Sequence, residues 1–489
     1  MKNIKQYIAL LIITIIFNAC DDFVDVDPRG VQVAETLDDV DLLLNATVEL
    51  SDAASGFSNA IPAIINDNIV VDESTVNAFI TQTTEESQYG QMYKLSEQFY
   101  INGKRDETWA RSYAVIGSAN HILSILEKIE PETEREISIK NRFTAEALTH
   151  RAFSYFWLVN IYGQHYGLTG ASEANSGVPI ISEFGDFDSP TPRATVNEVY
   201  DFILNDLTTA LPLATTSIDF THRVSRLGVQ ALLAKVYLHM GRYDEALTAT
   251  EDALSLNDVL LDYNDETYCA LDFDGNCELD FDGLPLQIQL PIEIENPEFA
   301  LFKDGLPIVA FTNSFVFLTM ASLSDDLLDL YDFDFDLRFR TFSEDYETGN
   351  TVFGNEENIF FLRSNDGVTV PELMLIQAEC LARDNQYGTA IDIVNALRAT
   401  RFATGSDYEL FAADGDEALV HIKEERRREF HVNSKRFFEI KRYNAQDNDG
   451  IEITRGSVTL APNSINWAMP IGQNVIDFSQ GSVVQNPRE

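Results

Sequence analysis

Apolar positions recur at intervals of three and four residues over most of the chain, which predicts a largely helical protein. The segment 107–130 is the first long example. Trp109, Tyr113 and Ile116 fall on one face of it, and Pro131 follows directly. We therefore expect a long helix that buries this face against the rest of the protein.

Two further helices are predicted on either side of a loop. Residues 143–162 are apolar nearly all round in their second half, so we expect a deeply buried helix there. Residues 195–198, Thr-Val-Asn-Glu, form a capping box that opens a helix ending near Leu211. The intervening segment 163–193 is rich in glycine, serine and proline and is predicted to be an ordered insertion.

A repeated helix-pair pattern follows. Ala234, Tyr237 and Gly241 match tetratricopeptide spacing, in which a small residue lies at a helix crossing and glycine makes the turn. A second copy has Ala378 at the crossing, and the helices either side of the insertion form a split copy. Such pairs stack so that each buries its apolar face on the next. We therefore expect helix-pair units near residues 143–211, 226–256 and 370–400.

The span from about 257 to 370 lacks this rhythm and is acidic, aromatic and rich in loop residues. No linker divides the chain, so residues 20–489 are predicted to form one domain. The expected fold class is all-α, with tetratricopeptide-type helix pairs packed against this irregular, loop-rich half, which we expect to carry the ligand side.

The first residues are typical of a lipoprotein signal peptide over 1–19. A short basic start precedes a ten-residue apolar block at 8–17, which is too short to span a bilayer. Ala19 and Cys20 then resemble a bacterial lipobox, which implies cleavage before Cys20 and lipidation of its sulfur and new amino group. The alternative is a plain secretory signal followed by a chance cysteine.

Charge excludes some functions. The chain has 79 acidic and 34 basic residues, a net charge of −45, which argues against nucleic-acid binding and against attachment to anionic lipid through basic residues. No phosphate-binding glycine loop, H-E-x-x-H motif or G-x-S-x-G motif is present. We therefore expect no cofactor and no catalytic residues. An acidic surface hydrolase remains an alternative, because counting cannot exclude a catalytic pair among so many carboxylates.

One acidic loop has oxygen-bearing side chains at every second position. In a calcium-binding loop, side chains at alternate positions point toward the ion. The glycines of this loop, however, do not occupy the positions that an EF-hand requires. We interpret the loop as a solvated acidic segment, with calcium binding as the alternative. Two cysteines flank it, and in an oxidising compartment a disulfide and two free thiols both remain open. The candidate calcium ligands are Asp272, Asp274, Asn276 and Glu278, and the candidate disulfide joins Cys269 and Cys277.

Seven basic residues are concentrated between Arg426 and Arg442, interleaved with aromatic residues. Arginines in such helices commonly pair with carboxylates of neighbouring helices, and we adopt this structural interpretation. The alternative is a site for an anionic sugar.

Seven segments of the chain carry motifs that occur together, in a fixed order, in one known family. They are residues 20–28, 39–46, 146–163, 324–338, 372–401, 424–443, and 467–471 with 485–487. In this order they resemble the SusD/RagB family of nutrient-binding outer-membrane lipoproteins, and the resemblance covers nearly the whole chain. Each segment alone is a loose match, but seven in the correct order make the resemblance specific. Asp326 stands where the family usually has glutamate.

The resemblance implies a helical, surface-exposed lipoprotein that is not an enzyme. Family members bind oligosaccharides, or in some cases peptides, and cover a TonB-dependent outer-membrane transporter of the SusC-like type. The expected partners are therefore this transporter, a glycan ligand and the outer membrane through the lipid anchor. Peptide ligands and a non-transport surface scaffold are the alternatives.

Two aromatic loop stretches lie roughly where family members carry binding loops. Flat apolar side chains suit the C–H faces of sugar rings, and the chain has only three tryptophans to supply them. We therefore predict that the ligand contacts come from Tyr89, Tyr93 and Tyr100 in one stretch and Phe315 and Phe317 in the other. We also expect the ligand to be neutral or cationic, because the acidic chain repels polyanions.

Overall fold

The structure is a computed structural model. It describes residues 34–45, 60–71, 73–80, 87–101, 103–185, 190–217, 222–271, 275–280, 283–291, 296–305, 321–341, 364–431 and 433–489.

Helices dominate the described residues. The amino-terminal part holds α2 (Leu37–Leu44), α4 (Ala60–Ile64), α5 (Glu73–Ile80) and α6 (Ser87–Tyr93). The long helices that follow are α7 (Glu107–Lys128), α8 (Glu134–Tyr162), α9 (Val196–Ala210), α10 (Arg226–His239) and α11 (Tyr243–Leu254). The second half holds α12 (Asp325–Leu328), α13 (Val370–Arg383), α14 (Tyr387–Ala399), α15 (Gly415–Glu429), α16 (Lys435–Gln446) and α17 (Gln473–Phe478).

The strands are short and form antiparallel two-stranded pairs. Among the described residues, one pair is a local hairpin and the others join segments that are far apart in the sequence. The pairs within the described residues are β1 (Ile69–Val71) with β4 (Ala321–Leu323), β2 (Phe299–Leu301) with β6 (Val368–Thr369), β3 (Asp304–Gly305) with β5 (Ser364–Asn365), and β7 (Ile453–Arg455) with β8 (Val458–Leu460).

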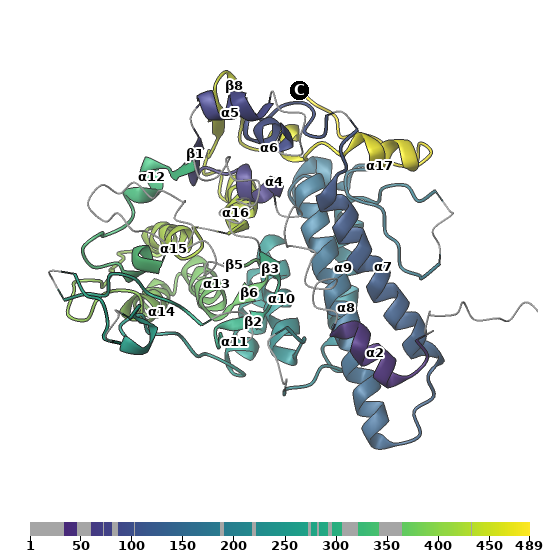
Figure 1. Cartoon of the computed structure of the whole chain (residues 1–489), viewed down its shortest axis with the longest axis horizontal. Coiled ribbons are helices and arrows are strands. Elements are labelled where there is room, and N and C mark those ends of the chain that lie inside the picture. Colours follow the sequence, from purple (N-terminus) through teal and green to yellow (C-terminus); the bar gives the residue numbers. More distant parts are fainter. Residues whose placement is uncertain are drawn as a thin grey trace, which may run out of the picture.

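The long helices form one continuous row of neighbours. In Figure 1, α7, α8 and α9 lie at one side of the molecule, α13, α14 and α15 at the other, and α10 and α11 between them. Successive helices contact each other along this row: α7 with α8, α8 with α9, α10 with α11, and α13 with α11, α14 and α15. This arrangement confirms the predicted all-α class and the helix pairs. The segment between α11 and α13 holds only short elements among its described residues.

Local signals set the helix ends. Thr195 caps α9 and forms a reciprocal capping box with Glu198, as predicted. Gly241 takes a φ of 72° at the turn between α10 and α11, a conformation that favours glycine. One boundary was predicted too late: α8 begins at Glu134, because Thr133 and Glu136 form another capping box before the apolar stretch.

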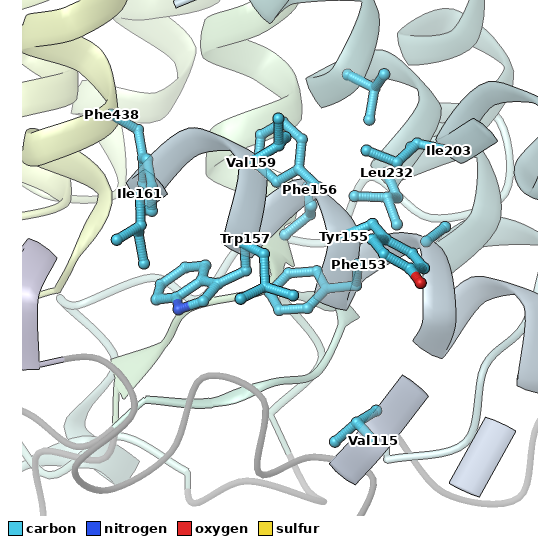
Figure 2. Packing of buried hydrophobic residues seen from close by; sticks show 14 of the residues in the cluster. Val115, Phe153, Tyr155, Phe156, Trp157, Val159, Ile161, Ile203, Leu232 and Phe438 are labelled. Carbon is cyan, nitrogen blue, oxygen red and sulfur yellow. The ribbon is translucent and has the colours of Figure 1, made fainter. Parts of the chain in front are cut away.

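Aromatic residues of α8 join distant parts of the chain in the core. The ring of Trp157 packs edge-on against Phe438 of α16, with centroids 4.9 Å apart, and stacks on Phe153 at 5.8 Å (Figure 2). Burial of such large side chains dominates core energetics. The buried face expected for residues 143–162 is therefore the contact between the helix row and α16.

The last residues of the chain complete the core around the end of α8. Asn486 donates through Nδ2 to the carbonyls of Tyr162 (2.9 Å) and Met469 (2.7 Å). The Met469 amide donates to the Ile161 carbonyl at 3.0 Å. Arg193, at the end of the insertion, donates to the Val484 carbonyl at 3.0 Å. Segments separated by some 300 residues are thus joined through buried hydrogen bonds.

None of the helices in this described part of the chain has both the length and the apolar character that a bilayer span requires.

Ala234 is fully buried on α10, and a larger side chain there should overpack the helix pair. We expect Ala234→Leu to lower the free energy of unfolding by about 1–3 kcal/mol, measured by denaturant or thermal melting. Ala114→Leu, on an exposed position of α7, is the matched control and should change stability little. Equal stability of the Ala234 variant and the wild-type chain would refute the helix-crossing assignment.

Candidate ligand-binding site

The three tyrosines predicted to contact ligand lie in the core instead. Tyr89 is 2% exposed, and Tyr93 and Tyr100 are 7% exposed. The hydroxyl of Tyr93 accepts from the Val71 amide at 2.8 Å, and the guanidinium of Arg455 lies 4.4 Å from its ring centroid. Their rings are packed against protein, so they offer no face to a sugar. Proximity to a family loop did not reveal which way the rings point.

The other predicted side chains divide between described and undescribed residues. Phe315, Phe317, Asp272, Asp274 and Cys20 lie outside the described part of the chain. Asn276 and Glu278 are exposed, and among the described residues no group of three acidic, histidine or cysteine side chains could hold a metal ion. Cys269 and Cys277 form a disulfide, with their Cα atoms 5.5 Å apart.

The basic segment at 426–442 is internally paired, which confirms the structural interpretation. Arg426 bonds Glu439 at 2.7 Å, and Arg442 bonds Glu379 at 2.5 Å. All four side chains are buried. The buried arginines pair with carboxylates, and the Lys441 ammonium donates to the carbonyls of Asn160 and Gly163. These residues therefore do not form an open site for an anionic sugar.

One buried ion cluster centres on Glu425 of α15. Its carboxylate accepts from Arg338 (2.6 Å), Arg398 (2.6 Å) and Arg428 (2.9 Å). Burial alone would raise the pKa of Glu425, but the three guanidinium groups outweigh burial and hold this pKa well below its usual range. The cluster ties the irregular half, through Arg338, to α14 and α15.

A cavity of about 420 Å³ lies between α7, the insertion and α17. We call it the aromatic pocket and define it by Trp109, Tyr113 and Gly117 on α7, Phe184 of the insertion and Phe478 at the end of α17. In Figure 1, α17 lies beside the upper part of α7. Its volume is in the range of ligand pockets, ~300–1,000 Å³.

Two phenylalanines stand at the rim of the aromatic pocket with much of their surface in solvent. Phe478 is 85% exposed and Phe184 is 47% exposed. The Phe184 ring also stacks on His121, with centroids 4.2 Å apart. Large apolar side chains held at a concave surface are typical of binding sites, since folding gains little from them.

Asp106 fixes the floor of the aromatic pocket to the wall formed by the C-terminal segment. It caps α7 by accepting from the Trp109 amide at 3.0 Å. The same oxygen accepts from the Tyr162 hydroxyl at 2.7 Å, and the other oxygen accepts from the Gly472 amide at 3.0 Å. Burial raises the pKa of Asp106, and these hydrogen bonds oppose that rise. This carboxyl therefore positions Trp109 relative to α17.

The insertion wall is held by polar groups of α7. The Tyr113 hydroxyl donates to the Pro179 carbonyl at 2.7 Å, and Asn120 donates to the Ile181 carbonyl at 2.9 Å. Asn120 in turn accepts from Arg151 at 2.7 Å. Since these groups are occupied within the protein, the pocket is largely preformed.

Charge is sparse in the aromatic pocket. Glu183 is the one charged side chain among the described residues that line it. Its polar groups include Asn474 and Gln480, and Gln480 is exposed with a φ of 52°. The arrangement suits an uncharged ligand with both an apolar face and hydroxyl groups.

Sequence reasoning missed Phe184, Phe478 and Gly117, and it assigned Trp109 to the core alone. The sequence contains one weak signal for this site, which is Gly117 itself. A glycine inside the strong helical pattern of residues 107–130 is unusual, because glycine destabilises the interior of a helix. No local pattern indicates that residues 478 and 113 share one cavity, because that depends on the docking of the C-terminal segment.

Two family matches cover separate parts of the chain. Residues 22–238 match a SusD-like family described as "Starch-binding associating with outer membrane", and residues 370–488 match the SusD family. Two relatives from Formosa agariphila, SusD-like protein P38 and SusD-like protein P2, are each 30% identical over 161 and 149 residues. These stretches cover 32% and 30% of this chain, and the chain spans about a quarter of the length of both relatives, 27% and 26%.

Solved structures share the fold over nearly the full length. A SusD superfamily protein from Bacteroides thetaiotaomicron has a TM-score of 0.69 at 21% identity, covering 93% of this chain and 100% of that one. A SusD-like carbohydrate binding protein from Bacteroides vulgatus has a TM-score of 0.62 at 17% identity, covering 93% and 99%. At such identities the likeness establishes the architecture.

Proposed function

This chain belongs to the SusD/RagB family, and from that membership we propose that it is a surface-exposed lipoprotein that binds a nutrient glycan and delivers it to a TonB-dependent outer-membrane transporter. The family is one of binding proteins rather than enzymes, associated with the outer membrane. The observation that carries the proposal for this chain is the aromatic pocket with its two solvent-exposed phenylalanines.

We place the glycan in the aromatic pocket. Sugar rings present flat C–H faces that pack on aromatic side chains, and their hydroxyls need neutral donors and acceptors. Tyr113 and the rim phenylalanines provide the flat apolar surface, with the buried ring of Trp109 packed behind Tyr113. Gln480 provides a neutral donor and acceptor. This replaces Tyr89, Tyr93 and Tyr100 as the contacts predicted from sequence.

The ligand is expected to be uncharged or cationic. The chain has a net charge of −45, the basic segment at 426–442 is paired internally, and the described pocket lining contributes only Glu183. Polyanionic glycans would meet no free cation there. Stacking contacts should also make affinity nearly independent of salt, whereas charge pairing would weaken steeply with salt.

Two measurements test the function. Purification from outer membranes in mild detergent should recover a large TonB-dependent transporter with this chain. Calorimetric titration of neutral glucans, mannans and fructans, beside alginate and a sulfated galactan, should show salt-insensitive binding of a neutral glycan. Isolation of the chain alone, under conditions that keep comparable complexes whole, would contradict delivery to a transporter. Binding of peptides in place of every glycan would instead favour the peptide-binding alternative.

Membrane attachment should depend on Cys20. Lipidation of its sulfur and amino group supplies several acyl chains, which together anchor a protein stably where one chain is marginal. We expect Cys20→Ala to abolish lipid labelling and to release the chain from the outer-membrane fraction. A Cys380→Ala variant is the control, because Cys380 is a buried free cysteine. Retention of the Cys20 variant in the membrane would refute the lipoprotein assignment.

A further inference from the structure

Gly117 lies within α7 at the floor of the aromatic pocket, and neither packing nor backbone conformation accounts for it. A Cβ atom built there would have no heavy atom within 4 Å, and the residue has an ordinary helical backbone. Glycine in a helix interior is destabilising relative to alanine. The fold therefore loses stability at this position and gains no contact in return.

We propose that Gly117 determines which ligands the aromatic pocket accepts, by leaving bare helix backbone on which an uncharged sugar ring lies flat. The inference rests on the proposed glycan-binding function and adds the ligand class and the residue that selects it. Trp109, Tyr113 and Gly117 follow one another at intervals of four on α7 and therefore share a helix face. A side chain at position 117 would project into the same space.

The surroundings of Gly117 define the chemistry of the ring. Phe184 and Phe478 belong to the two elements that line the pocket opposite α7, and both present exposed aromatic carbon to an entering ring. Glu183 is the one charged lining residue among those described, which leaves a uronate or sulfate group without a cation. The exposed amide of Gln480 can both donate and accept, as a pair of hydroxyls requires.

Stability and affinity should respond in opposite directions to substitution at position 117. Alanine and leucine are better helix formers than glycine, so Gly117→Ala and Gly117→Leu should melt at the wild-type temperature or above it. Their side chains occupy ligand space, so affinity should fall a fewfold for alanine and about tenfold or more for leucine. A loss of affinity without a loss of melting temperature would show that the substitution acts on ligand binding and not on folding.

The experiment titrates the full chain in detergent with neutral gluco-, manno- and fructo-oligosaccharides, alginate oligosaccharides, a sulfated galactan and hydrophobic tripeptides. Gly388→Leu is the matched control, because Gly388 is another helical glycine with no heavy atom within 4 Å of a built Cβ and lies on α14, away from the pocket. We expect one neutral oligosaccharide to bind the wild type and the Gly388 variant equally and the Gly117→Leu variant at least about tenfold more weakly.

Other binding results would contradict different parts of the proposal. Equal binding of the neutral oligosaccharide by Gly117→Leu would refute the role of Gly117 while leaving the glycan function standing. Binding of only alginate or the sulfated galactan would refute the uncharged ligand class but not glycan binding. Binding of tripeptides alone, or of nothing in the panel, would refute both the glycan function and this inference.

Discussion

Glu425→Gln should lower the free energy of unfolding by about 3–5 kcal/mol. The substitution removes the negative charge that three buried guanidinium groups share, those of Arg338, Arg398 and Arg428. An amide has the same size, but it cannot neutralise them and presents an N–H group to donors. Arg338 keeps Asp336 and Glu429 as partners, but Arg398 loses the carboxylate with which it pairs and Arg428 loses its nearer one. Buried cations that lose their compensating charge, with little access to water, cause the loss. Chemical denaturation at pH 7 measures it.

Acid provides an independent check on the same cluster. The folded-state pKa of Glu425 is held below its unfolded value, so its stabilisation is complete above the unfolded pKa and is lost as pH falls through the folded pKa. The difference between the wild type and Glu425→Gln should therefore narrow below about pH 4, the ordinary range for glutamate. Glu245→Gln is the control, because Glu245 pairs with Arg242 at an exposed position and should cost less than about 1 kcal/mol. A comparable loss in both variants would contradict this account.

Asp106→Ala should be nearly as damaging, at about 3–4 kcal/mol. It removes the cap of α7 and leaves the Tyr162 hydroxyl and the Gly472 amide without their carboxylate acceptor inside the protein. Because Gly472 precedes α17, ligand affinity should fall as well, as the wall of the aromatic pocket loosens. Thermal melting and calorimetric titration measure the two effects separately.

A graded series isolates the role of Asp106. Asp106→Asn keeps one acceptor oxygen for the cap but loses the other, so it should fall between the wild type and Asp106→Ala. Asp414 is the comparison: it caps α15 at an exposed site by accepting from the Glu417 amide at 2.9 Å. Asp414→Ala should cost only about 1 kcal/mol, the value of a cap alone. If both aspartates cost the same, Asp106 is no more than a helix cap.

The helices could be predicted because their signals are local. The faces of 107–130, the capping box at Thr195 and the turn at Gly241 each depend on residues within a few positions of one another. The pairing of the arginines with carboxylates could also be predicted, because it is energetically costly to bury a guanidinium group without an opposite charge beside it. The early start of α8 was missed because its first turns are polar, although the Thr133 capping box marks it.

The candidate site could not be predicted in the same way. Tyr89, Tyr93 and Tyr100 were chosen for their chemistry, but whether a tyrosine ring faces solvent or core depends on the tertiary contacts of the loop that carries it. The aromatic pocket combines α7, the insertion and α17, which hydrogen bonds between residues far apart in sequence bring together. Gly117 was the local clue, and it indicates a site only once the space above it is known.

The docking of the last residues onto α8 has a consequence for biogenesis. Tyr162 receives its hydrogen bond from Asn486, and the Ile161 carbonyl receives one from Met469, so the amino-terminal helices lack these bonds until the end of the chain is available. Until residues 469–486 have been synthesised, the helix row therefore cannot reach its final packing. The amino-terminal helices therefore gain their full stability late, when residues 469–486 have joined the core, and not as each helix is made.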